Sequence, residues 1–160
     1  MTQAQRTIMR AFDFGTGGYN MDYMIIGTGN DCLHSDAFGI PQYLTQRCTS
    51  VEINQTVDNM IEVGEMLISV GITPVYSVYP KWDDIQLSNL ETGFGLMWTI
   101  TESNYNLLRD THSQRIAAEL PSALLVDTWE EYSTIGDGIH PDETTTFRSA
   151  GKLLDAMNGN

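Results

Sequence analysis

Three short apolar stretches alternate with amphipathic segments along this chain, and no other feature constrains its fold as strongly. The apolar stretches predict strands at Met21–Gly27, Thr73–Val78 and Ala123–Asp127. Alternating strands and helices are typical of a parallel sheet, because each helix carries the chain back across one face of the sheet. The sequence therefore predicts an α/β fold, and the nearly continuous apolar run of Met21–Gly27 predicts a strand buried on both faces.

Four segments have the apolar periodicity of a helix. The clearest one has a capping-box pair, Thr49 and Glu52, at its start and Gly71 at its end. In a second one His112 lies near the apolar stripe, and we interpret it as a packing or boundary residue, not as a ligand. Besides the helix that starts at Thr49, helices are expected at Thr2–Phe12, at about Glu102–Leu120 and at Thr144–Met157.

The composition bounds the kind of partner that the chain can bind. It has 160 residues, of which 41% are hydrophobic, and this is enough for one domain with a core of its own. The formal net charge is −13 and only eight residues are Lys or Arg, so no nucleic acid partner is expected. We expect residues 1–160 to form a single domain, because no repeat, low-complexity tract or linker interrupts them.

No part of the sequence predicts a membrane span or a signal peptide. Every apolar run falls short of the ~20 residues that cross a bilayer, and residues 1–7 lack the charged-then-apolar layout of a signal peptide. A soluble protein is therefore expected, while its compartment stays open. The two cysteines, Cys32 and Cys48, are too few for a disulfide framework, and the sequence favours two free thiols over a pair.

The segment Gly136–Pro141 carries the best candidate for a catalytic group. Asp137 precedes His140 by three residues, and a tight turn between them would bring the carboxylate to the imidazole Nδ1–H. Such a contact fixes the tautomer and leaves Nε2 free to act as a base. The turn follows the predicted strand Ala123–Asp127, and open α/β folds place their chemistry at the carboxyl ends of parallel strands.

A second group of polar residues follows the first predicted strand. Gly29 lets the backbone approach a ligand closely, and Asn30 can point its amide N–H at a developing negative charge. A plain turn, in which Asn30 and Asp31 cap the next segment, explains the same residues equally well. Trp82 lies in the loop after the second strand, over the same edge of the sheet. Asn30 is thus a candidate oxyanion donor, and Gly29, Asp31 and Trp82 are candidate substrate-binding residues.

These stretches, in this order, resemble the SGNH (GDSL-type) hydrolases over nearly the whole chain. Gly27–Asp31 is similar to the family's third block, whose Asn donates to the oxyanion, and Asp137–Pro141 is similar to the fifth block, which supplies the catalytic Asp and His. The resemblance implies a flavodoxin-like, three-layer α/β/α fold with a parallel sheet. It also implies a serine esterase that needs no cofactor or metal, acts on an acylated carbohydrate or a lipid, and uses Asn30, Asp137 and His140.

The chain also departs from the family pattern. Thr28 stands where the third block usually begins with Gly, and Thr144 where the final helix often begins with Gly. The first block, a strand followed by the Gly-Asp-Ser that carries the nucleophile, has no counterpart, and neither has the second block with its oxyanion Gly. Only about twenty residues precede the strand that leads to Asn30, whereas each crossover unit needs some 30 or more. The fold is therefore expected to lack its first strands, and Thr16 is rejected as a nucleophile.

Two functions from different classes remain. In the first, the chain is the C-terminal part of an ester hydrolase whose serine comes from a missing or separate segment. In the second, it is a catalytically degenerate domain that serves as a binding or structural module in a larger assembly. Either way Met21–Gly27 would have an open edge, so we expect association with a complementing segment or with a copy of the chain. A third hypothesis is a metal site, although neither candidate cluster has a strong ligand spacing: Asp137, His140, Asp142 and Glu143, or Asp31, His34 and Asp36.

Overall fold

Three strands form a parallel sheet in the order β3-β4-β5 within the residues that the structure describes. The computed structural model describes residues 8, 10, 12–13, 15–27, 48–86, 89, 92 and 100–159. β3 is Tyr23–Ile26, β4 is Thr73–Ser77 and β5 is Leu124–Val126. All three strands lie inside the apolar stretches that predicted them.

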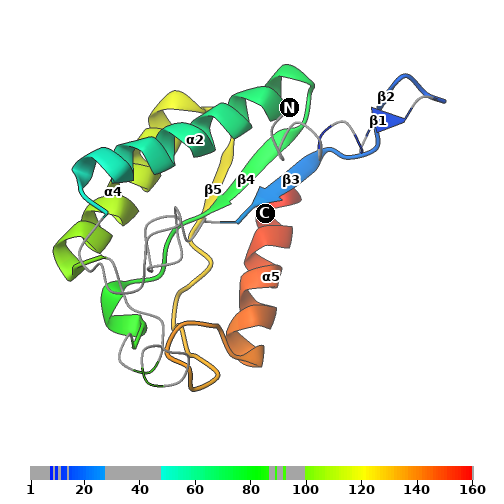
Figure 1. The fold of residues 1–160 in the computed structure, drawn as a ribbon. Coiled ribbons are helices and arrows are strands. Elements are labelled where there is room, and N and C mark those ends of the chain that lie inside the picture. The colour runs from blue at the N-terminus through cyan, green and yellow to red at the C-terminus, as the bar shows by residue number, and fades with distance from the viewer. Residues whose placement is uncertain are drawn as a thin grey trace.

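Helices cover both faces of this sheet (Figure 1). α2 (Ser50–Ser69) and α4 (Glu102–Glu119) pack against each other and against the sheet on one face, while α5 (Glu143–Met157) packs against β5 on the other. This is the three-layer α/β/α arrangement, so the predicted fold class is confirmed. Of the helices in the described ranges, none is both long enough and apolar enough to cross a membrane.

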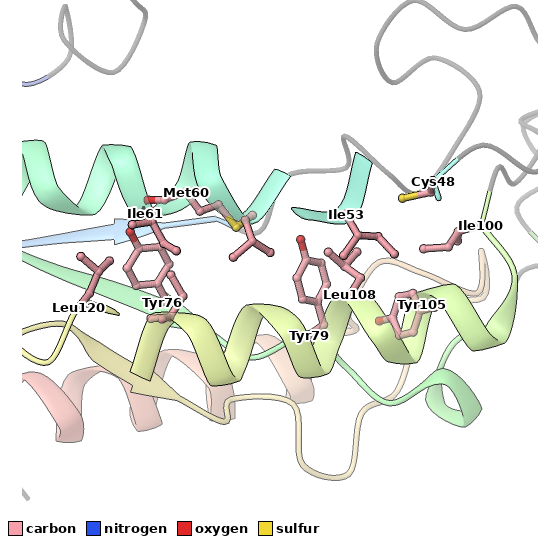
Figure 2. Packing of buried hydrophobic residues seen from close by; sticks show 12 residues of the cluster. Cys48, Ile53, Met60, Ile61, Tyr76, Tyr79, Ile100, Tyr105, Leu108 and Leu120 are labelled. Atoms are coloured by element: carbon pink, nitrogen blue, oxygen red, sulfur yellow. Dashed lines mark hydrogen bonds between the residues drawn. The ribbon is translucent and has the colours of Figure 1, made fainter. Parts of the chain in front are cut away.

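The main core lies between α2, α4 and β4. Figure 2 shows its side chains, which point from the two helices and the central strand into one shared layer. Tyr76 of β4 is fully buried there, and its hydroxyl donates a 2.7 Å hydrogen bond to the Met60 carbonyl oxygen of α2. Burial raises the pKa of the Tyr76 phenol. The phenol therefore stays a donor and joins the central strand to the helix.

Local sequence signals set the ends of the helices. The backbone N–H of Thr49 donates to Glu52 Oε2 at 2.8 Å, so the predicted capping box of α2 is present. At the other end of α2, Gly71 has a φ of 80°, which residues with a Cβ atom avoid. α5 begins one residue earlier than predicted, because the Asp142 side chain accepts a 2.8 Å hydrogen bond from the Thr145 N–H and caps the helix.

Within the described part of the chain β3 lies at an edge of the sheet, and the prediction that it is buried on both faces is wrong. Ile26 pairs with Tyr76 and therefore lies on the face that α2 covers. Tyr23 and Ile25 alternate to the other face, where they are 39% and 52% exposed. The apolar pattern of a strand does not indicate which elements lie beside that strand. The sequence therefore could not show that one face of β3 is exposed.

The chain before β3 forms a short antiparallel hairpin, in which β1 (Phe12–Asp13) pairs with β2 (Gly18–Tyr19). Phe12 was expected to end the first helix but is a strand residue. Its ring packs edge-on against Tyr19, with 5.2 Å between the ring centroids. Ile8 is helical and buried in a second, smaller core cluster. The predicted C-terminal end of that helix is therefore wrong.

Cys48 lies just before α2, is almost completely buried and takes part in a disulfide bond. The interpretation as free thiols is therefore wrong for Cys48. The only other cysteine of the sequence, Cys32, lies outside the described residues. Two cysteines in a sequence do not reveal their distance in the fold, and this is why the sequence could not predict the bond.

His112 of α4 is fully buried, and its interpretation as a packing residue is confirmed. Its ring packs edge-on against Tyr79 and Tyr76, with centroid distances of 5.2 and 6.0 Å. Neither ring nitrogen has a hydrogen-bond partner within the part of the chain that the structure describes. Burial lowers the pKa of His112 from 6.5 to about 4, so the ring is neutral at neutral pH.

Candidate functional site

Asp137 and His140 lie at the two ends of one tight turn in the chain between β5 and α5. The Nδ1 atom of His140 is 2.6 Å from Asp137 Oδ2. An ionised carboxylate can only accept a hydrogen bond, so Nδ1 carries the proton and donates it. The contact, predicted at ~2.6–3.2 Å, is confirmed. It leaves Nε2 of the neutral ring without a proton.

The second oxygen of Asp137 anchors the turn. Oδ1 accepts hydrogen bonds from the backbone N–H groups of Ile139 and His140, each at 2.9 Å. The carboxylate is nearly buried, and this burial acts to raise its pKa. The hydrogen bonds from Ile139 and His140, together with the charge of the imidazole, outweigh burial and lower the pKa of Asp137. Asp137 is therefore ionised and fixed in direction at neutral pH.

The imidazole of His140 is open to a reactant. Its side chain is 68% exposed, whereas that of Asp137 is 7% exposed. A carboxylate buried behind an exposed imidazole orients the ring and stabilises the imidazolium that forms when Nε2 takes up a proton. The geometry therefore supports proton transfer at Nε2.

A network of hydroxyl groups ties this turn to the start of α5. Ser133 Oγ donates to Asp142 Oδ2, and the Ser133 backbone N–H donates to Thr145 Oγ1 at 3.0 Å. The bond from Ser133, followed by those from Thr145, lowers the pKa of Asp142. A backbone bridge between Thr134 and Pro141 closes the loop beside His140. The cap of α5 and the candidate site thus share one set of hydrogen bonds.

Further residues hold the turn from outside, and sequence reasoning missed them. Asn89 Nδ2 donates to the Gly136 carbonyl oxygen at 3.3 Å. The backbone N–H of Gln86 donates to the Gly138 carbonyl oxygen at 2.7 Å, and the Tyr132 hydroxyl donates to the Ile139 carbonyl oxygen. Gly138 has a φ of 85°. The Asp-Gly pair at the start of the turn was the one available signal, since it favours a residue with positive φ.

The predicted oxyanion donor Asn30 lies outside the described residues, as do Gly29 and Asp31. Trp82 is described and begins a short 3₁₀ turn, Trp82–Asp84, after β4. Its ring packs against Tyr105 of α4, with 5.4 Å between centroids, and is partly buried against the main core. Trp82 therefore has a packing role, and its role in substrate binding stays a prediction.

No group of three or more His, Cys, Asp and Glu side chains is placed to hold a metal ion within the described ranges. This covers one of the two hypothetical clusters, Asp137, His140, Asp142 and Glu143. The carboxylate of Asp142 has a structural role that needs no metal, because it caps α5 and accepts a hydrogen bond from Ser133. The other hypothetical cluster, Asp31, His34 and Asp36, lies outside the described residues.

Comparisons with known proteins give one informative likeness. No family model matches the sequence, and no curated protein matches it. Among solved structures, the chain resembles a crystal structure from Bacteroides fragilis that is described as a "putative acylhydrolase". The TM-score is 0.60 at 12% sequence identity, and the match covers 99% of this chain and 71% of the other. At this identity the likeness shows the fold alone: the chain has a hydrolase-like α/β fold.

Proposed function

We propose that this chain carries the general base of an ester hydrolase. The observation that carries the proposal is the 2.6 Å contact between Asp137 Oδ2 and His140 Nδ1, with the carboxylate buried and the imidazole exposed. The likeness of the fold to that of the Bacteroides fragilis protein supports the same class of reaction. The resemblance of the sequence to SGNH hydrolases narrows the class to serine esterases that act on acylated carbohydrates or lipids.

In this proposal His140 moves one proton in each step. Nε2 accepts the proton of a serine hydroxyl while the serine oxygen bonds to the ester carbonyl carbon, and the carbonyl oxygen becomes an oxyanion. Asn30 donates a hydrogen bond to that oxyanion. When the bond to the alcohol breaks, Nε2–H returns the proton to the leaving oxygen. Water then repeats these steps on the acyl-serine, which releases the acid, and Asp137 stays ionised throughout.

We infer that the serine comes from a segment outside residues 1–160. Within the described residues β3 pairs with β4 alone, so its other edge can accept a further strand. A parallel strand there would run in the direction of β5 and end at the edge of the sheet where β5 leads toward His140. A helix that follows such a strand would cover the exposed Tyr23 and Ile25.

The proposal is tested with the chain alone and 4-nitrophenyl acetate. We expect slow hydrolysis by the wild type, because a general base without its serine can activate only water. His140→Gln should abolish this reaction and Asp137→Asn should slow it. Equal rates for the wild type and His140→Gln would contradict the proposal.

A fluorophosphonate probe tests where the nucleophile lies. We expect no adduct on residues 1–160 alone, because the proposal assigns the serine to another segment. An adduct on a serine of the chain would move the nucleophile into the chain and keep the role of His140. Ser35 would be the first serine to check, because it follows Asn30 closely in the sequence.

As a second candidate function, the chain is a degenerate SGNH-like domain that binds a partner and catalyses no reaction. The edge position of β3 and the exposure of Tyr23 and Ile25 favour it, since such an edge binds a strand whether or not a reaction follows. Capture of a strand at β3, together with no hydrolysis that depends on His140, would favour this candidate over the enzyme.

A further inference from the structure

Two peptide groups hold the carboxylate of Asp137, and the first of them is itself held at its other end. The Ile139 N–H donates to Asp137 Oδ1 at 2.9 Å, and the carbonyl of the same peptide group belongs to Gly138. That carbonyl accepts the 2.7 Å hydrogen bond from the backbone N–H of Gln86. A peptide group is planar, so a bond that fixes its carbonyl also fixes the direction of its N–H.

The second peptide group repeats this arrangement. The His140 N–H donates to Asp137 Oδ1 at 2.9 Å, and the carbonyl of this group, from Ile139, accepts a hydrogen bond from the Tyr132 hydroxyl. Burial, and after it the charge of Asp137, raises the pKa of Tyr132 to about 12, so the hydroxyl is a donor throughout the neutral range. The Tyr132 ring packs edge-on against Trp129, with 5.4 Å between centroids.

The loop that carries Gln86 is fastened to α4. The Tyr105 hydroxyl donates to the Pro80 carbonyl oxygen at 2.9 Å, and Arg109 Nε donates to the Tyr79 carbonyl oxygen at 3.0 Å. Both donors come from α4, and both acceptors lie in the loop that leads from β4 to Gln86. The start of the loop that leads to Gln86 is therefore fastened to α4.

The contact with Gln86 leaves no room for a side chain on Gly138. A Cβ atom at Gly138 would lie 2.0 Å from the Gln86 carbonyl oxygen. Gly136 lies in the same turn with a similar backbone, a φ of 99°, but has nothing within 4 Å of the corresponding position. The backbone of Gln86 therefore lies very close to Gly138. This short separation allows the Gln86 N–H to donate to the Gly138 carbonyl oxygen.

We propose that Gln86 and Tyr132 are positioning residues for the pair formed by Asp137 and His140. Each fixes one of the two N–H groups that hold Asp137 Oδ1, and together they set the direction of Oδ2 toward His140 Nδ1. Both act through the backbone of the turn. The inference rests on the proposed function, because it assigns the residues that keep the proposed base in one tautomer.

The test of Tyr132 removes one hydroxyl and keeps the ring. Tyr132→Phe is compared with Tyr76→Phe, which removes a hydroxyl that also donates to a backbone carbonyl, on α2. Nitrogen-15 shifts of the His140 ring at alkaline pH report the ratio of the Nδ1–H and Nε2–H tautomers. In Tyr132→Phe we expect a roughly fivefold change of this ratio toward Nε2–H, which corresponds to one ordinary hydrogen bond. Tyr76→Phe should leave the ratio unchanged.

The test of Gln86 isolates the effect of its N–H by comparing two substitutions that both remove the side chain. Gln86→Pro lacks the donor, and the preceding Ile85 has φ −106° and ψ 143°, the extended conformation that a following proline favours. Gln86→Ala keeps the N–H and is the matched control. The proline variant should shift the tautomer ratio in the same direction as Tyr132→Phe, and the alanine variant should retain the wild-type ratio.

A wild-type ratio in Tyr132→Phe would overturn the inference for Tyr132, and a wild-type ratio in Gln86→Pro would overturn it for Gln86. The measurement needs no substrate, so its failure is distinct from failure of the proposed function. A chain that hydrolyses no ester can still show the tautomer shift. Equally, hydrolysis that depends on His140 can persist when neither variant changes the ratio.

Discussion

Gly64 of α2 lies so close to Tyr76 of β4 that a Cβ atom on Gly64 would be 2.5 Å from the phenolic oxygen. The same Cβ atom would be 2.5 Å from Leu120 Cδ1. The hydroxyl of Tyr76 reaches the Met60 carbonyl of the same helix at 2.7 Å. Helix and sheet therefore approach at the one residue of α2 that has no side chain to separate them.

Gly64→Ala should destabilise the protein although alanine favours a helix. The gain in helix propensity is about 1 kcal/mol, and the cost of overpacking is about 1–3 kcal/mol, so we expect a net loss of up to about 2 kcal/mol in the free energy of unfolding. Urea unfolding measures it. Gly151→Ala on α5, where nothing lies within 4 Å of the added Cβ, should stabilise by about 0.5–1 kcal/mol. Equal effects of the two substitutions would contradict the steric explanation.

His112 should make stability depend on pH. Its pKa is about 4 in the folded protein and 6.5 in a solvated chain, so between these values the unfolded chain binds a proton that the folded protein does not. The contribution of neutral His112 to the free energy of unfolding is fully present above pH 6.5. About 3 kcal/mol is lost as the pH falls from 6.5 to about 4. Urea unfolding of the wild type and His112→Leu over this range should show a steeper fall in the wild type. Parallel curves would contradict it.

The cap of α5 should weaken when Asp142 loses its oxygens. Asp142→Ala removes the acceptor of the Thr145 N–H, whereas Asp142→Asn keeps one. We expect a lower urea midpoint for the alanine variant and a smaller change for the asparagine variant. The pKa of Asp142 is lowered in the fold, so the benefit of its charge is present above pH 3.8 and is lost as the pH falls through the folded value. A constant difference between wild type and Asp142→Asn at all pH values would count against this.

Gly138→Ala should damage the fold more than Gly136→Ala. Both positions have positive φ, so alanine is strained at either one, at a cost of order 1–2 kcal/mol. Only Gly138 also faces the Gln86 carbonyl oxygen, 2.0 Å from an added Cβ. Thermal unfolding of the two variants compares them directly. If Gly136→Ala were the less stable, the contact with Gln86 would not be the reason for glycine at residue 138.

The open edge of β3 should make the purified chain associate. Ile25 is 52% exposed beside that edge, and Ile25→Lys should reduce association because a charged edge strand resists pairing. Val51→Lys is the matched control, since Val51 is 76% exposed on α2. Sedimentation velocity at micromolar concentration measures both. A wild-type chain that sediments as a monomer and melts cooperatively would rule the association out.

Contacts between residues that are close together in the sequence could be predicted from it. Thr49 and Glu52, like Asp137 and His140, are three residues apart, so the backbone itself limits how far their side chains can separate. The alternation of strands and helices was similarly informative, because a parallel sheet needs a crossover between successive strands. The α/β class and the contact between Asp137 and His140 follow from such local constraints.

The features that the sequence did not predict depend on residues far apart in the chain. The exposure of Ile25 depends on which strands lie beside β3, and the disulfide of Cys48 depends on a distance in space. The packing of Trp82 depends on Tyr105 of α4, which lies more than twenty residues later in the chain. The role proposed for Gln86 could not be recognised from its residue type, because it depends on a backbone N–H that almost every residue has.

The two bonds that hold the peptide groups of the turn differ in how much of the chain must fold before each can form. Tyr132 and Ile139 are close in sequence, so their bond can form as soon as the segment after β5 turns back on itself. Gln86 and Gly138 are separated by the whole of α4 and β5, so the closure of that loop carries an entropic cost that other tertiary contacts must offset. The turn should therefore first form loosely and become rigid late in folding, and substitutions at Gln86 or Gly138 should accelerate unfolding while hardly slowing folding.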